Sequence, residues 1–92
     1  MGRKSTPSED REHGRRLGVL IAARRRERGR SAPDLAQESS VAIDTVRSLE
    51  NGRVATPTFL TIARLAEALD LSLDELHVRA WQEIDSAVRE SQ

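Results

Sequence analysis

Hydrophobic residues recur along this chain at the three- and four-residue spacing of amphipathic α-helices, in five successive segments. Leu17, Leu20 and Ile21 show this spacing in the first segment, where they share one face of a helix. The predicted helices span about residues 8–28, 31–38, 43–50, 58–69 and 72 to near the C-terminus. The pattern therefore predicts an all-α protein.

Residues that favour helix ends mark the boundaries of these segments. Ser31 precedes the second helix and has Asp34 three residues later, and Ser72 stands in the same relation to Glu75. Both pairs match the capping box, in which two side chains satisfy free N–H groups at a helix start. Gly29 follows the first helix, where glycine commonly ends a helix. We expect the break between the second and third helices at residues 39–40.

The fourth predicted helix is the most apolar segment, and Thr58 is its predicted cap. We expect this helix to be buried at the centre of the protein, because its apolar positions are dense. These positions are Phe59, Leu60, Ile62, Ala63, Leu65, Ala66 and Leu69.

The ends of the chain differ from its middle. Residues 1–8 are polar, contain Pro7 and lack apolar periodicity, so we expect a flexible basic arm. Ser8 is the predicted start of the first helix because acidic residues follow it. Residues 9–80 are predicted to form one helical domain, and residues 81–92 a helical extension.

Composition narrows the fold and the cellular context. The chain has 92 residues, enough for one domain, and Phe59 and Trp81 are its only aromatic residues, so the core must be aliphatic. Cysteine is absent, which excludes disulfides and thiolate metal sites. The longest apolar run, residues 19–23, is too short to span a membrane, and the polar N-terminus does not resemble a signal peptide. We therefore expect a cytoplasmic protein without a membrane partner.

Charge is distributed unevenly although the net charge is zero. Residues 1–30 carry ten basic and four acidic side chains, whereas residues 54–92 carry three basic and seven acidic ones. A basic first third can face a phosphate backbone, but a merely solvated basic helix is an equally good interpretation.

No pattern of catalytic or metal-binding residues is present in the sequence. His13 and His77 are the only histidines, and neither has the spacing of a metal site or an acid-paired base. A phosphate-binding glycine loop is also lacking. We therefore expect no enzyme, no cofactor, no metal and no small-molecule substrate.

The second and third predicted helices, residues 31–38 and 43–50, are short and separated by a turn of about four residues. This arrangement is typical of a helix-turn-helix, in which the second helix enters the major groove of DNA. The small side chain of Ala36 would let the two helices cross closely. An ordinary pair of antiparallel helices is the alternative that spacing leaves open.

Residues 17–76 resemble the phage-repressor/Cro-like (Xre) helix-turn-helix family. The matching features are Leu17-Gly18, Ile21, Arg25, Arg28-Gly29, Ser31, Leu35-Ala36, Val41, Thr45-Val46, Leu49-Glu50-Asn51-Gly52, Pro57, Leu60, Ile62-Ala63, Ala68-Leu69 and the run from Ser72 to Leu76. The resemblance implies a compact five-helix lambda-repressor-like bundle with an extended C-terminal helix. It also implies a dimeric, sequence-specific transcriptional regulator that binds double-stranded DNA through a recognition helix at about Ile43–Glu50.

The resemblance assigns roles to individual residues. It implies a structural ion pair between Arg25 and Glu50, which would join the first helix to the recognition helix. The expected base-facing residues are Ile43, Asp44, Arg47 and Ser48. Of these, Arg47 is the one suited to guanine, because a guanidinium can donate to two acceptors on its edge. Ser40 stands where the turn of this family normally has glycine.

Phosphate contacts are expected around the recognition helix and in the basic arm. The candidates are Ala32, Ala42, Asn51, Gly52, Arg53, Arg3 and Lys4. Backbone N–H groups past the recognition helix, together with Arg53, could clamp one phosphate. Arg3 and Lys4 could reach along the duplex or into a minor groove. Additional arginines between residues 24 and 30 would add positive field.

Two alternatives concern partners other than DNA. Trp81, Ile84 and Val88 form an apolar stripe that either mediates a homodimer or folds back on the core of its own chain. The bundle could also serve as a protein-interaction module, or as an antitoxin-like protein that binds a partner through an altered third helix.

Overall fold

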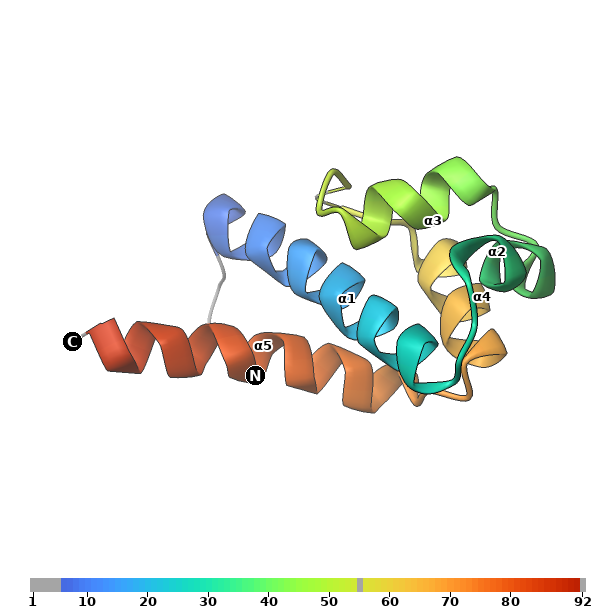
Figure 1. Cartoon of the computed structure of the whole chain (residues 1–92). Helices are drawn as coiled ribbons and strands as arrows, with labels where there is room; N and C mark the ends of the chain where they lie inside the picture. The colour runs from blue at the N-terminus through green and yellow to red at the C-terminus, as the bar shows by residue number, and fades with distance from the viewer. Residues whose placement is uncertain (1–5, 55, 92) are drawn as a thin grey trace.

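Five α-helices make up the residues that the computed structural model describes, 6–54 and 56–91, with side chains described as far as Gln82 (Figure 1). The helices are α1 (Pro7–Glu27), α2 (Ala32–Ser39), α3 (Ile43–Glu50), α4 (Phe59–Ala68) and α5 (Leu73–Ser91). No strand occurs in these described ranges. The predicted all-α, five-helix architecture is therefore confirmed.

Helix α1 begins earlier than predicted. Thr6, not Ser8, is its N-cap: the Thr6 hydroxyl accepts a hydrogen bond from the backbone N–H of Glu9, and the Glu9 carboxylate accepts one from the backbone N–H of Thr6. Pro7 follows in the first turn, where its missing N–H costs no hydrogen bond. Pro7 and Ser8 thus belong to α1 and not to the expected arm.

The other predicted caps are confirmed. Ser31 and Asp34 form the reciprocal capping box at the start of α2, with N–H to oxygen distances of 3.1 and 3.3 Å. Thr58 accepts from the backbone N–H of Thr61 at the start of α4. Ser72 accepts from the backbone N–H of Glu75 at the start of α5. These local signals fix where α2, α4 and α5 begin.

The helices form two groups that share α1 (Figure 1). Helix α5 runs alongside α1, while α3 contacts another face of α1 and also packs against α2, which in turn contacts α4. The core between them is aliphatic, as expected. It consists of Leu17, Leu20, Ile21, Leu35, Ala36, Val41, Val46, Leu49, Ile62, Leu65, Ala66, Leu69, Leu76 and Ala80. Among the described residues, no helix is long and apolar enough to cross a membrane.

The prediction that α4 is buried along its whole apolar length is wrong at its first turn. Phe59 is 75% exposed and Leu60 is 56% exposed. The buried positions Ile62, Leu65 and Ala66 follow the spacing i, i+3, i+4, so a single face of α4 meets the core. Phe59 and Leu60 lie at the N-terminal end of α4, outside that face.

Gly18 sets the distance between α1 and α3. A Cβ atom at this position would lie 2.0 Å from the carbonyl oxygen of Leu49 and 2.9 Å from its carbonyl carbon. Both atoms belong to the backbone, so no side-chain adjustment could relieve such an overlap. The two helices can cross this closely only because residue 18 has no side chain.

Candidate nucleic-acid interface

Helix α3 is anchored by one face and leaves the other open. Val46 and Leu49 are fully buried, and they hold the inner face of the helix in the core. Asp44 and Arg47 are exposed on the remaining surface, and Ser48 is half-buried. All four expected base-facing side chains, including Ile43, thus keep some accessible surface on one short helix, and Asp44 and Arg47 keep the most.

Ile43 differs from its three companions, because its half-buried side chain packs against the hydrophobic core. Part of this side chain therefore stabilises the fold and is not available to a partner.

The turn between α2 and α3 depends on a residue with left-handed backbone geometry. Ser40 has a φ of 60° and ψ of 32°, and its backbone N–H donates to the carbonyl of Ala36. Val41 then enters the core, and its N–H donates to the same carbonyl at 3.2 Å. Glycine adopts this conformation without strain, whereas a serine must overcome a clash of its Cβ atom.

Ala42 is the N-cap of α3, and no side chain caps the first turn of this helix. The N–H groups of that turn therefore lack the side-chain acceptor that Ser31 supplies at α2. An acceptor from a partner molecule could take its place.

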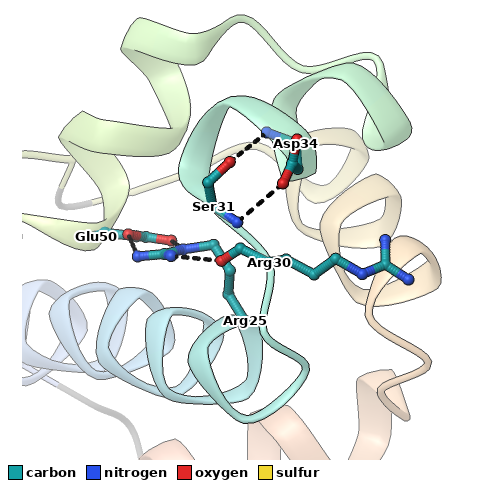
Figure 2. Close-up of polar contacts among 5 residues, drawn as sticks. All are labelled: Arg25, Arg30, Ser31, Asp34 and Glu50. Atoms are coloured by element: carbon teal, nitrogen blue, oxygen red, sulfur yellow. Dashed lines mark hydrogen bonds and ion pairs between the residues drawn. The ribbon is translucent and has the colours of Figure 1, made fainter.

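Arg25 and Glu50 form the ion pair that the family resemblance implied (Figure 2). The Arg25 Nε donates to Glu50 Oε2 at 2.8 Å, and Nη2 donates to Oε1 at 2.9 Å. The two side chains are only 13% and 9% exposed. The carboxylate of Glu50, through these hydrogen bonds, raises the pKa of Arg25 above its ordinary value, although burial acts in the opposite direction.

The same guanidinium also fixes the segment that leads into α2. Its Nη1 donates to the backbone carbonyl of Arg30 at 2.8 Å, directly before the cap residue Ser31 (Figure 2). Arg25 thus connects α1 with both helices of the helix-turn-helix. Its role is to orient these elements, because the pair is nearly shielded from solvent.

The backbone past α3 cannot clamp a phosphate in the expected way. The N–H groups of Asn51, Gly52 and Arg53 donate to the carbonyls of the last α3 turn, at 2.9, 3.1 and 2.9 Å. Gly52 has a φ of +75°, which this tight closure requires. Contacts from this segment to a partner would therefore depend on the side chains of Asn51 and Arg53, both of which are exposed.

Several arginines near the end of α1 are occupied within the chain. Arg24 donates to the carbonyls of Leu69 and Asp70, at 3.2 and 3.4 Å, and so satisfies backbone groups at the end of α4. Arg28 lies 3.5 Å from the Asp70 carboxylate, and Arg30 pairs with Glu38. The positive field expected from residues 24–30 is therefore partly neutralised by the protein itself.

Other arginines keep their charge available. Arg26, Arg47 and Arg53 are exposed, and no ion pair involves them within the described part of the chain. Arg47 and Arg53 lie on α3 and just after it, so they extend the open face of that helix.

Other predicted site residues lie elsewhere or cannot be placed. Trp81 packs within its own chain, because its indole stacks on the ring of His13 in α1. Arg3 and Lys4 fall outside the described residues, and the side chains of Ile84 and Val88 fall outside the described side chains.

Sequence reasoning missed three contributions to this architecture. The close crossing at Gly18, the Arg24 contact to the end of α4, and the meeting of His13 with His77 all join segments far apart in the chain. Gly18 is one of the residues that carry the family resemblance, but the resemblance does not explain why glycine is needed at this position. Nothing in the local pattern signals the other two contacts.

A family model described as a helix-turn-helix domain matches residues 16–78, from the middle of α1 into α5. A search of curated proteins gives no match to the chain.

Proposed function

Since the chain belongs to the helix-turn-helix domain family, we propose that it is a sequence-specific transcriptional regulator of the Xre type that places α3 in the major groove of double-stranded DNA. The main support for this proposal is the accessible face of α3, where Asp44 and Arg47 are exposed. Val46 and Leu49 anchor the opposite face in the core. A helix held this way can enter a groove without losing its place in the core.

Arg47 is the main base-contacting residue in this proposal. Its exposed guanidinium has no ion-pair partner within the described residues and can donate two hydrogen bonds to guanine. Asp44 would accept a hydrogen bond from a cytosine amino group, and Ser48 can donate or accept. Ile43 contributes little more than a contact with a thymine methyl group, because its side chain packs on the core.

Phosphate contacts would position the domain on the duplex. The start of α3 at Ala42 has no side-chain cap, so a phosphate oxygen can accept from its first N–H groups. Ala32 occupies the corresponding first turn of α2, and Asn51 and Arg53 follow α3 with exposed side chains. Arg3 and Lys4 remain part of the proposal as residues of a basic arm.

We also propose a homodimer, because paired recognition helices match two half-sites about one DNA turn, roughly 34 Å, apart. Trp81 is half-buried against α1, so its surface is shared with its own chain. The dimer contact is therefore assigned mainly to Ile84 and Val88. A chain truncated after Gln82 keeps the Trp81 contact and should have the mass of a monomer; a mass that stays at the dimer value would refute this assignment.

A selection of bound sequences from random DNA, followed by fluorescence anisotropy at two salt concentrations, tests the DNA-binding proposal. Arg47→Ala should weaken binding to the selected site by about 1–3 kcal/mol and relax the preference at one position. Arg53→Ala should weaken binding to all DNA sequences alike. It should also reduce the slope of log affinity against log salt concentration by about 1.

Arg79→Ala is the matched control. It removes the same charge from an exposed position on α5, a helix that lies across α1 from α3 (Figure 1). Affinity should change little. The regulator proposal would be refuted if the chain bound DNA without sequence preference and the Arg47 and Arg79 variants bound DNA with equal affinity.

A protein-interaction module is the second candidate, and one observation favours it. Phe59 and Leu60 are exposed beside each other at the start of α4, and adjoining exposed apolar side chains can mark a protein-interaction site. If selection yields no DNA sequence, a Phe59→Ser variant should lose binding to a protein partner, whereas Arg47→Ala should keep it. An antitoxin-like protein would show both activities.

A further inference from the structure

Both histidines of the chain and its single tryptophan meet where α1 and α5 contact each other. His13 lies on α1, and His77 and Trp81 lie one turn apart on α5. The His13 ring stacks on the indole, with centroids 4.5 Å apart and planes inclined by 27°. The His77 ring meets the edge of His13 at 4.9 Å and 70°. One titratable pair therefore contributes directly to the contact between the two helices.

The position of His13 favours a neutral ring. Its Nε2 atom is buried and has no hydrogen-bond partner among the described residues. In the imidazolium form both ring nitrogens carry protons, so this site would hold a buried N–H without an acceptor. The neutral form avoids that cost, because one ring nitrogen is unprotonated.

Burial is the main reason that the pKa of His13 lies below its ordinary value, and the neighbouring His77 lowers it further. The His77 backbone and the Asp10 carboxylate act in the opposite direction, with smaller effect. The indole face also attracts a cation, but this attraction is weaker than the cost of an unsatisfied buried donor.

Among the described side chains, a few other charged groups lie near the cluster. Asp74 on α5 lines the same hollow as His13 and His77. Arg16, one turn after His13 on α1, pairs with Glu12 at 3.2 Å, and Glu9 lies one turn before His13. The loop before α4 and α4 itself contribute only uncharged side chains to this hollow, namely Pro57, Phe59 and Ile62.

We propose that His13, His77 and Trp81 form a pH-sensitive latch that holds α5 against α1 when His13 is neutral and releases it when His13 is protonated. His13 precedes residues 16–78 and Trp81 follows them, so the latch joins the two segments that flank the matched helix-turn-helix domain. It requires no DNA and acts independently of the residues assigned to base contact.

The sign of the effect follows from the lowered pKa of His13. The unfolded chain, with a histidine pKa of about 6.5, takes up its proton before the folded chain does. Stability is therefore greatest above that value and falls as the pH drops toward the pKa of folded His13. Below the pKa values of both the unfolded and the folded chain, His13 causes no further loss of stability.

Trp81 emission measures the latch directly, because the chain has one tryptophan and no tyrosine. In the full chain the emission maximum should move to longer wavelength between pH 8 and 5, with a midpoint below about 6.5. His13→Phe keeps an aromatic ring on the indole but cannot titrate, so its emission should stay constant. His77→Gln removes the neighbouring imidazole, so the midpoint should rise.

Proton NMR titration of the two imidazole rings in the unmodified chain provides a test that needs no variant. His13 should titrate below about 6.5. A His13 midpoint at or above that value would overturn the proposal. So would an emission maximum that stays fixed from pH 8 to 5, including one whose intensity falls without a shift. A shift retained by His13→Phe would exclude this histidine as the switch.

Discussion

Removing the charge of Glu50 is the sharpest test of how this helix-turn-helix is held together. Glu50→Gln keeps the shape of the side chain but leaves the Arg25 guanidinium without its counterion at a site where the pair is 13% and 9% exposed. Breaking a buried ion pair by losing one partner costs about 3–5 kcal/mol. Arg25 retains its hydrogen bond to the Arg30 carbonyl. We therefore expect a loss near the lower end, about 3 kcal/mol.

Urea denaturation followed by helical circular dichroism measures this loss. A domain of this size has only about 5–15 kcal/mol of total stability, so the midpoint should fall markedly while the slope stays unchanged. Glu38→Gln is the matched control, because Glu38 pairs with Arg30 at sites that are 40% and 38% exposed. Exposed pairs contribute little to stability, so the Glu38→Gln midpoint should stay close to that of the parent chain.

A double variant completes the argument. Arg25→Met combined with Glu50→Leu removes both charges and should be more stable than Glu50→Gln alone, since no buried charge is left unpaired. A Glu50→Gln loss no larger than that of Glu38→Gln would refute the reasoning, because it would mean that the pair is effectively solvated.

Two further predictions concern backbone geometry, and both are measured by the urea midpoint. Gly18→Ala gains up to about 1 kcal/mol of helix propensity, but its Cβ atom would lie 2.0 Å from the Leu49 carbonyl oxygen, so a net loss of about 2 kcal/mol is expected. A variant as stable as the parent would show that α1 and α3 separate easily. Ser40→Gly should stabilise the chain by about 0.5 kcal/mol, because Ser40 has a φ of 60° that glycine adopts without strain; an unchanged or lower midpoint would contradict this.

The sequence by itself determined where the helices lie. Capping pairs such as Ser31 and Asp34 act within one turn, and apolar spacing acts within one helix, so both are visible in a short stretch of chain. The start of α1 was missed by two residues, because Thr6 and Ser8 both suit a cap and only the first is paired with Glu9. Such choices between neighbours depend on small energy differences.

The candidate site was predicted less completely. The family resemblance, and not the spacing, pointed to Arg25 and Glu50, and the structure confirms their ion pair. The position of residues 51–53 directly after the recognition helix suggested a backbone phosphate clamp, whereas the N–H groups there close the end of the helix. The assignments of Asp44, Arg47 and Ser48 to bases remain predictions.

Only the tertiary structure decided which distant residues meet. Gly18 touches the backbone of Leu49, Arg24 caps the end of α4, and His13 stacks on Trp81. Each contact depends on the angle and distance at which two helices cross, and these follow from the packing of the whole core. Helical periodicity determines which side of a helix is buried, but it does not determine which other helix covers that side. For the same reason the apolar first turn of α4 could be recognised in the sequence, while its exposure could not.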